Sequence, residues 1–335
     1  MSKGLLEVHG TLSVQQFWPR GTSDADTAQV VVDKFLFGPS ASKLKQTKVF
    51  TSAVVKRSEG AKTGQAAISK KGEVTVRLQG IDAPELHFRP TYEHTNVKQN
   101  AAIKAYNGDF RQPLGEAAAN AMHQLVQGLG SDPLPCIVRT RVNQPNDVFD
   151  MFGRPIGDIY VKMGASEVDL NHWLLQHGWA FPTFYTSMQD DEIEEILSIA
   201  AVAENAGKGV WASYTAKATN LNLKLLNPGA NATFSASKDK GKVTMPKLFR
   251  RASTWSVGTS AKLFTGTFGD YLRAHSDDCW TTKSFLSGGA AKTTKKRLHD
   301  FISSTNTFTS TPGGLVFGEG NSFVVDKNGK AITGF

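Results

Sequence analysis

The nine residues RLQGIDAPE (77–85) close an apolar–polar alternation that is typical of a strand with one buried face. Two carboxylates, Asp82 and Glu85, follow the strand on either side of Pro84. Proline fixes its own φ and keeps Ala83 out of the helical region, so the turn is rigid. Rigid carboxylates at the end of a strand are suited to holding a cation or a water molecule.

A second segment, FGRPIGDIYV (152–161), places Arg154 at the mouth of another strand. Together with Arg77 it supplies two guanidinium groups, whose paired donors match phosphate oxygens and stay charged at any working pH. A hard divalent cation prefers oxygen ligands such as those of Asp82. A glutamate such as Glu85 can orient or deprotonate a water molecule. The residue types therefore indicate phosphate chemistry.

The wider pattern predicts an α+β fold, an OB-fold-type five-stranded β-barrel with three packed helices. The expected strands are 5–17, 26–37, 73–81, 136–142 and 157–161. The expected helices run over 114–129, from an N-cap at Asp169 to Gly178, and from a Ser187–Asp190 capping pair to Gly207.

Residues 38–72 are rich in Gly, Ser and Lys, with one strand-like stretch at 48–56. They predict an extended hairpin with a mobile end. The segment either reaches toward substrate or is a surface insertion, and we favour the insertion.

The composition changes after Trp211, which predicts a catalytic domain at 1–212, a linker at 213–240 and a smaller basic C-terminal domain at 241–335. The short strand-like pieces of residues 241–335 favour a mostly-β domain, with one helix at 292–302. Its aromatic residues either form a core or a stacking surface for nucleic acid, and we favour the core. They are Trp255, Phe264, Phe268, Tyr271, Trp280 and Phe285.

Charge is unevenly distributed over the chain, whose formal net charge is +8. Residues 216–335 hold 17 Lys and Arg against 7 Asp and Glu, a net of +10, whereas residues 1–215 hold 21 against 23, a net of −2. Such a basic region either attracts a polyanion, nucleic acid or an anionic membrane surface, or is an ordinary solvated surface.

The sequence also bears on the cellular location of the protein. No apolar run approaches the roughly 20 residues of a membrane span. The start lacks the apolar core of a secretory signal, which predicts a cytoplasmic protein unless a signal was removed or export uses another route. Cys136 and Cys279 lie far apart and outside any metal-binding spacing, so both are expected to be buried free thiols.

Residues 5–213 resemble the staphylococcal-nuclease-like, or thermonuclease, family. RLQGIDAPE is similar to that family's RLxGIDxPE segment, and FGRPIGDIYV to its YGR strand. Further similar pieces follow in the family's order. They are Asp24-Ala25-Asp26-Thr27 for the DGDT loop, GEAAANAMHQLV (115–126) for the first helix, and DLNHWLLQHGWAFPTFY (169–185) and AENAGKGVW (203–211) for the last two helices.

The resemblance implies one Ca²⁺ ion, held by Asp26, Asp82 and the Ala83 carbonyl. It implies that Glu85 acts on the attacking water and that Arg77 and Arg154 bind the scissile phosphate. The implied activity is cleavage of DNA or RNA at the phosphorus–5′-oxygen bond, which leaves 3′-phosphates.

A calcium-dependent nuclease is the leading hypothesis, and two alternatives to it stay open at this point. One is a catalytically weak nucleic-acid-binding scaffold, and the other is the nuclease effector of a toxin or defence system. The sequence determines neither the preferred nucleic acid nor the oligomeric state.

One departure from the family pattern bears on metal binding. Ala25 replaces glycine in the DGDT-like loop, which requires a backbone conformation that alanine can adopt. Asp24 is expected to be a turn residue rather than a ligand.

Overall fold

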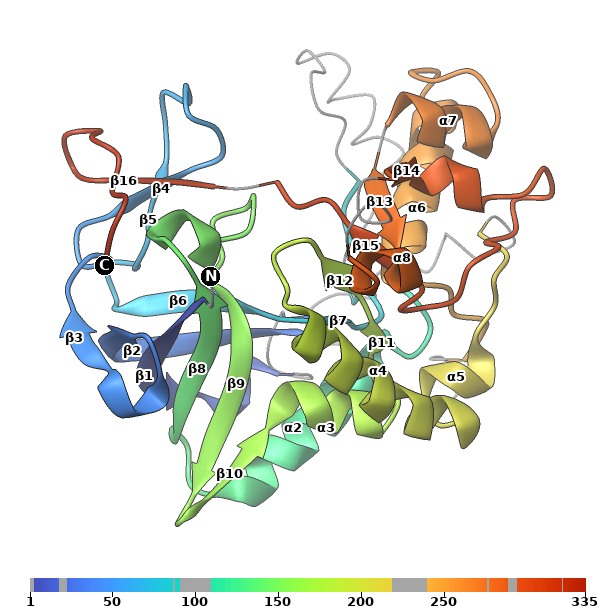
Figure 1. The fold of residues 1–335 in the computed structure, drawn as a ribbon. Helices are drawn as coiled ribbons and strands as arrows, with labels where there is room; N and C mark the ends of the chain where they lie inside the picture. Colours follow the sequence, from blue (N-terminus) through green and yellow to red (C-terminus); the bar gives the residue numbers. More distant parts are fainter. Residues whose placement is uncertain are drawn as a thin grey trace.

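The structure of the chain is a computed structural model, which describes residues 3–17, 23–86, 88–90, 110–218, 240–275, 277–288, 294–320 and 322–335. Strands predominate up to residue 82, helices and strands are interspersed between residues 115 and 213, and helices dominate the start of the last third (Figure 1).

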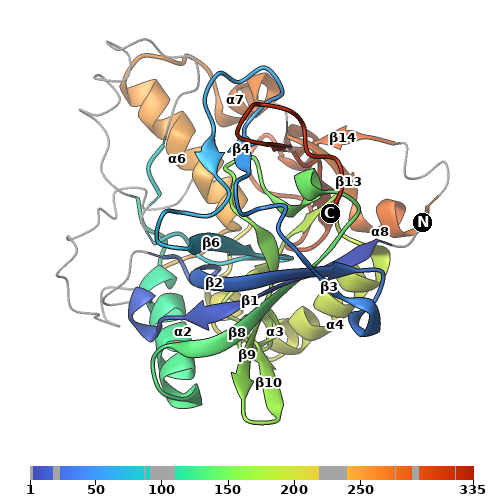
Figure 2. The same ribbon diagram turned by 90° about the vertical axis from the view of Figure 1, so that its left-hand side faces the viewer.

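Five strands form the barrel, and each pairs with two of the others. They are β1 (Gly4–Leu12), β2 (Thr27–Gly38), β6 (Glu73–Leu78), β8 (Leu134–Val142) and β9 (Ile156–Met163). The pairing runs from β1 to β2, β6, β9 and β8 and returns to β1; only β6 and β9 are parallel. In Figure 2, β1 lies between its neighbours β2 and β8 in one wall of the barrel. This strand order confirms the predicted OB-type arrangement.

The three predicted helices are confirmed as α2 (Gly115–Leu129), α3 (Leu170–Gln176) and α4 (Asp190–Asn205), followed by the short α5 (Val210–Ser213). The Asp169 side chain accepts the His172 N–H and caps α3 as expected. The Ser187–Asp190 capping pair is wrong, because Gln189 and Glu192 form the capping box of α4.

The end of the first predicted strand also differs from expectation, since β1 stops at Leu12 and η1 (Val14–Gln16) is a 3₁₀ helix. Ser13 accepts the Gln15 N–H there, and this local side-chain bond replaces strand pairing.

The 38–72 segment contributes to the core instead of ending in a free hairpin. It contains η2 (Ala41–Lys43), β3 (Lys45–Thr47), β4 (Val54–Lys56) and β5 (Gln65–Ala66). Phe50 is 1% exposed, and its ring lies 5.1 Å from that of Phe35 and 5.4 Å from that of Phe149.

The prediction of a mostly-β C-terminal region is wrong. It contains α6 (Pro246–Ser260), α7 (Phe268–Ala274) and α8 (Thr282–Leu286) beside the short β13 (Asp278–Thr281), β14 (Lys296–Arg297) and β15 (Leu315–Phe317). The strand-like windows were too short to display the helical period. In α6 Leu248 and Ala252 are buried in one cluster and Trp255 packs against it, at helical spacings of four and three residues, and Pro246 starts the helix.

The predicted helix at 292–302 is also wrong where the structure describes it. β14 is followed there by the 3₁₀ helix η5 (Leu298–Phe301), while residues 291–293 lie outside the described residues. Most of the predicted 213–240 linker, residues 219–239, lies outside them as well.

Strands from both parts of the chain share two small sheets. β12 (Phe184–Tyr185) pairs with β15, and β16 (Phe323–Val325) pairs with β4. The terminal Phe335 ring stacks on Phe37 with centroids 3.8 Å apart. The assignment of 241–335 to a domain of its own stays a prediction.

The C-terminal aromatic residues form core, as favoured from the sequence. Phe268, Tyr271 and Phe285 are buried, and Trp255, Phe264 and Trp280 are partly buried against the same clusters. Both cysteines are buried free thiols.

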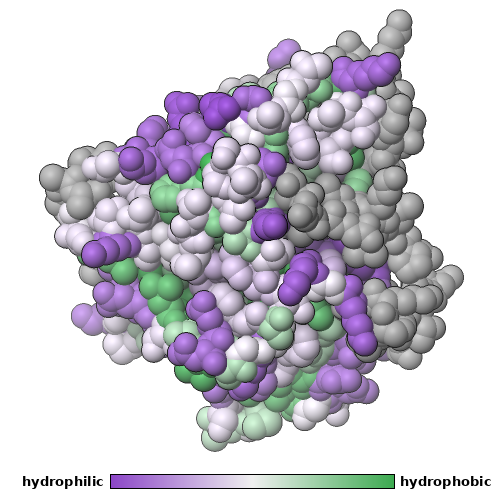
Figure 3. Space-filling view, turned by 90° about the vertical axis from the view of Figure 1, so that its right-hand side faces the viewer, coloured by the Kyte–Doolittle hydropathy of each residue, from purple (hydrophilic) through white to green (hydrophobic). Residues whose placement is uncertain are grey.

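The face that includes α6 and α7 shows hydrophilic residues spread over the surface with smaller hydrophobic areas between them (Figure 3). Within the described ranges no helix is long and apolar enough to cross a bilayer.

Replacing Phe50 by alanine is expected to lower the free energy of unfolding by about 3–5 kcal/mol, because the cavity would lie between the barrel, the insertion and the C-terminus. Urea unfolding followed by tryptophan fluorescence measures the change. Phe152→Ala is the control, since that ring is 51% exposed. Equal losses in the two variants would show that Phe50 does not join these segments.

Candidate active site

Asp26 and Asp82 meet because Asp26 comes directly before β2, and Asp82 comes shortly after the end of β6, the strand that pairs with the start of β2. Thr27, the first residue of β2, pairs with Arg77 near the end of β6, and β7 (Ile81–Asp82) follows directly. Arg77 bridges the two carboxylates, with Nη1 2.5 Å from Asp26 Oδ1 and Nη2 2.6 Å from Asp82 Oδ1.

The turn around Ala83 is fixed by the earlier loop. The Ala83 N–H donates to Asp26 Oδ2 at 2.6 Å, and the Leu86 N–H donates to Asp24 Oδ1 at 2.8 Å. Asp24 also closes a turn, since its carbonyl accepts the Thr27 N–H at 3.1 Å. The φ angle of Ala25 is not positive, so the loop accommodates alanine without strain.

Gly80 explains the glycine within RLQGIDAPE. Its φ is +74°, and a Cβ there would lie 2.2 Å from the Ile196 Cδ1 atom of α4. The positive φ therefore favours glycine between β6 and β7, whereas the Ile196 Cδ1 atom is the end of a flexible side chain.

Glu85 is held through its backbone by Gln112, a buried residue that sequence reasoning missed. The Glu85 N–H donates to Gln112 Oε1 at 3.1 Å, and the Glu85 carbonyl accepts the Gln112 N–H at 2.8 Å. Gly115 starts α2 so close by that a Cβ there would lie 2.8 Å from the Glu85 carbonyl oxygen.

The most important residue that sequence reasoning missed is Arg250, which projects from α6 into the acidic cluster. Its Nη1 and Nη2 lie 3.1 Å and 3.0 Å from the two oxygens of Asp82, and Nη1 also donates to Glu85 Oε1. The only sequence signal was the basic character of residues 216–335, which does not single out one arginine.

The cluster is almost closed to solvent. Asp26 is 1% exposed, Asp82 0% and Glu85 7%. Burial opposes ionisation of Asp82, but Arg250 and Arg77 outweigh it and hold the pKa of Asp82 below its usual value. Burial raises the pKa of Glu85 to about 8, despite Arg250. Burial and the neighbouring Asp26 raise the pKa of Asp24 to about 7.

Arg154 is the one predicted site residue whose side chain has its recorded contacts elsewhere. Its Nε and Nη2 lie 2.8 Å and 2.7 Å from Asp150 Oδ2, and its guanidinium is 5.5 Å from the centre of the Phe152 ring. Its backbone is nevertheless close to the cluster, because the Arg77 N–H donates to the carbonyl of the next residue, Pro155.

The oxygen atoms of this cluster are chemically suited to bind a hard cation. In this conformation, however, N–H groups occupy the carboxylate oxygens. Carboxylate and carbonyl oxygens of Asp26, Asp82 and Ala83 are the ligands that calcium prefers. Both oxygens of each aspartate accept N–H groups of Arg77, Arg250 or Ala83. Among the described residues no three His, Cys, Asp or Glu side chains are arranged to hold a metal ion. A cation at these carboxylates would compete with Arg77 and Arg250 for their oxygens.

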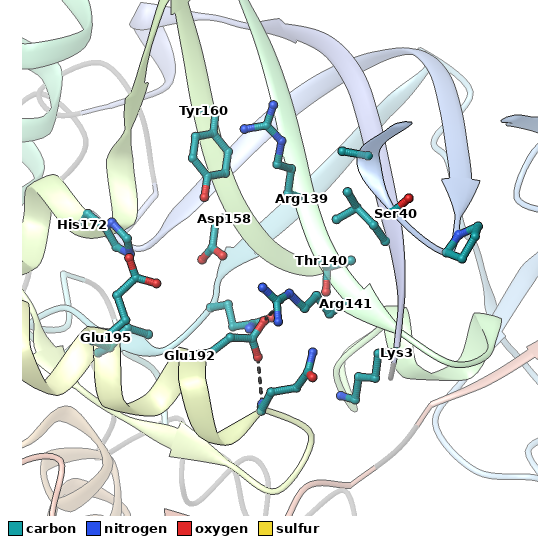
Figure 4. Close-up of a pocket in the computed structure, with 16 residues that line it drawn as sticks. Lys3, Ser40, Arg139, Thr140, Arg141, Asp158, Tyr160, His172, Glu192 and Glu195 are labelled. Carbon is teal, nitrogen blue, oxygen red and sulfur yellow. Dashed lines mark hydrogen bonds and ion pairs between the residues drawn. The ribbon is translucent and has the colours of Figure 1, made fainter. Parts of the chain in front are cut away.

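A separate cavity of 510 Å³ lies beside β8, β9, α3 and α4 and contains none of the predicted site residues (Figure 4). Its charged groups largely pair with one another or with nearby residues, as in the Arg139–Glu167 and Arg141–Asp191 ion pairs. Asp158 accepts the Asn171 amide at 2.7 Å, and burial together with Asp169 raises the pKa of Asp158 well above its usual value. This mixture of charges indicates structural pairing around the barrel wall.

The strand order defines an OB-type barrel, and a cluster of carboxylates and arginines lies at its strand ends. Residues 75–213 match the family model of the staphylococcal nuclease homologues, which points to a nuclease-type, nucleic-acid-binding fold for this part of the chain. The matched range includes Arg77, Asp82, Ala83, Glu85 and Arg154. The C-terminal region matches no family. The search of curated proteins found no match to the chain.

α6 is attached to the rest of the C-terminal region by Asp277. Arg251 donates to both oxygens of Asp277 at 2.7 Å, and Lys247 Nζ lies 3.5 Å from one of them. Burial opposes ionisation, but Lys247 and Arg251 outweigh it and lower the pKa of Asp277 to about 2. The ionised carboxylate therefore stabilises the fold above the unfolded-state pKa near 4, and this stability is lost as the pH falls through about 2.

Asp277→Asn is expected to lower the free energy of unfolding by about 2 kcal/mol at pH 7, with a smaller difference from the unsubstituted protein near pH 2. Urea unfolding at both pH values measures it. Asp191→Asn is the matched control, because Asp191 pairs with Arg141 with 65% of its side chain exposed, and such pairs contribute little. A loss that is the same at both pH values would contradict the role of the ionised carboxylate.

Proposed function

We propose that this protein is a calcium-dependent nuclease that hydrolyses phosphodiester bonds of DNA or RNA on the 5′-oxygen side and leaves 3′-phosphates. The observation that carries the proposal is the convergence of Arg77, Asp26, Asp82 and Glu85 in one buried cluster at the strand ends. Nucleic acid is the substrate class that suits the domain's fold.

In the proposed mechanism, Asp26, Asp82 and the Ala83 carbonyl hold the calcium ion. When bound, the ion neutralises charge on the phosphate and supplies an electrophilic centre. Arg77 donates to a phosphate oxygen and stabilises the charge that develops there. The Glu85 carboxylate accepts the proton of the attacking water. Arg154 takes part only after its guanidinium leaves Asp150.

Glu85→Gln is expected to lower kcat for oligonucleotide cleavage on the order of 10²–10⁴-fold, because the amide cannot accept the proton of the water. Arg77→Ala is expected to lower it on the order of 10²–10³-fold through lost stabilisation of the developing charge. Cleavage of end-labelled single-stranded and double-stranded DNA and of RNA at millimolar calcium, with and without a chelator, measures these effects.

Glu59→Ala is the matched control, since Glu59 is exposed and distant in sequence from the cluster. Phosphatase treatment of the products tests for 3′-phosphate ends. Absence of cleavage of every substrate with calcium present would contradict the nuclease proposal. Tight binding without turnover would identify the nucleic-acid-binding scaffold instead.

A further inference from the structure

Arg250 belongs to α6, outside the residues that match the nuclease family, yet its guanidinium lies inside the acidic cluster. It contacts Asp82 through two nitrogens and Glu85 through one. These are the carboxylates proposed to ligate the cation and to receive the proton of the water. A group in this position lies next to any phosphate that reacts there.

The direction of Arg250 is set by contacts on both sides of it. The Thr244 carbonyl, just before α6, accepts the Gln112 Nε2 group at 3.0 Å, and Gln112 in turn holds Glu85. On the other side, Arg251 is bound to Asp277 through two hydrogen bonds. The entry of Arg250 into the cluster is therefore a built feature of the fold and not a loose surface contact.

Two guanidinium groups share the cluster with four carboxyl groups. Asp24, Asp26, Asp82 and Glu85 carry four carboxyl groups against Arg77 and Arg250. If Asp82 ligated a divalent cation, the two Arg250 nitrogens that Asp82 accepts would be released. Arg250 would then keep its contact with Glu85 through Nη1 and face the same region with Nη2, and guanidinium donors match phosphate oxygens as well as they match a carboxylate.

We propose that Arg250 is a phosphate-binding residue of this site, supplied by the C-terminal region. The inference rests on the proposed nuclease function. Asp82 holds the guanidinium in the cation-free protein, and the substrate phosphate accepts its donors once the cation is bound. Arg250 thereby provides the second guanidinium beside Arg77, while Arg154 is engaged by Asp150.

The opposite role for the same contact is an inhibitory one, in which Arg250 only blocks the cation site. The two roles predict opposite effects on activity when Arg250 is removed. A phosphate-binding arginine loses activity when it is removed, whereas removal of an inhibitory arginine leaves activity unchanged or raises it.

The first test compares kcat/KM for cleavage of a single-stranded oligonucleotide at saturating calcium. Arg250→Ala is expected to lower it on the order of 100-fold, as for the loss of one donor to a transition-state oxyanion. Arg250→Lys restores part of it, because lysine keeps the charge but not the paired donors. Arg273→Ala removes the same charge from the exposed surface of α7 and is expected to stay within about threefold of the unsubstituted protein. Arg250→Ala activity at or above that of the unsubstituted protein would overturn the proposal.

The second test does not depend on turnover. Fluorescence anisotropy measures binding of the labelled oligonucleotide with calcium in the Glu85→Gln background, with and without Arg250→Ala. Adding Arg250→Ala to Glu85→Gln is expected to weaken oligonucleotide binding on the order of tenfold. Equal affinities would overturn the inference, whereas absence of cleavage by the unsubstituted protein would count against the nuclease function alone.

Thermal unfolding of each variant shows whether the fold survives, since Arg250→Ala leaves Asp82 and Glu85 with fewer partners. If that variant does not fold, Arg250→Lys decides the question. A loss of about tenfold in kcat/KM supports the proposal, and an unchanged value overturns it.

Discussion

The fully buried carboxylate of Asp82 is the group on which the candidate site depends. A charge that is removed from water must be paired, and removing one partner of a buried pair typically costs about 3–5 kcal/mol. Arg77 comes from the barrel and Arg250 from α6, so the two partners of Asp82 come from regions far apart in the chain. The need to balance one carboxylate thus ties the C-terminal helix to the strand ends.

The C-terminal region is accordingly joined to the site and not merely adjacent to it. The β12–β15 pairing places it beside the segment that follows α3, and the Gln112–Thr244 hydrogen bond connects the backbone of Glu85 to the start of α6. If Arg250 serves the reaction, the site is divided between residues that match a family model and a region that matches none. Cation binding and phosphate binding would then be linked through competition for Asp82.

The loop that carries Arg154 is held by two segments that the barrel itself does not require. Gln65 of the insertion donates to the carbonyls of Phe152 and Gly153 at 2.9 Å and 3.0 Å. Ser322, just before β16, donates to the carbonyl of Asp150. The position of Arg154 therefore depends on the insertion and the C-terminal strand together, and a substrate that recruits Arg154 must break its ion pair with Asp150.

The sequence by itself determined the barrel strands, the three helices and the carboxylate-bearing turn, because periodicity, caps and RLQGIDAPE are local signals. It also identified Arg77, Asp26, Asp82 and Glu85, which the strand ends bring together. Only the tertiary structure decided the helical start of the C-terminal region, the engagement of Arg154 by Asp150 and the entry of Arg250. Those features depend on contacts such as Arg250–Glu85, 165 residues apart, which no local pattern encodes.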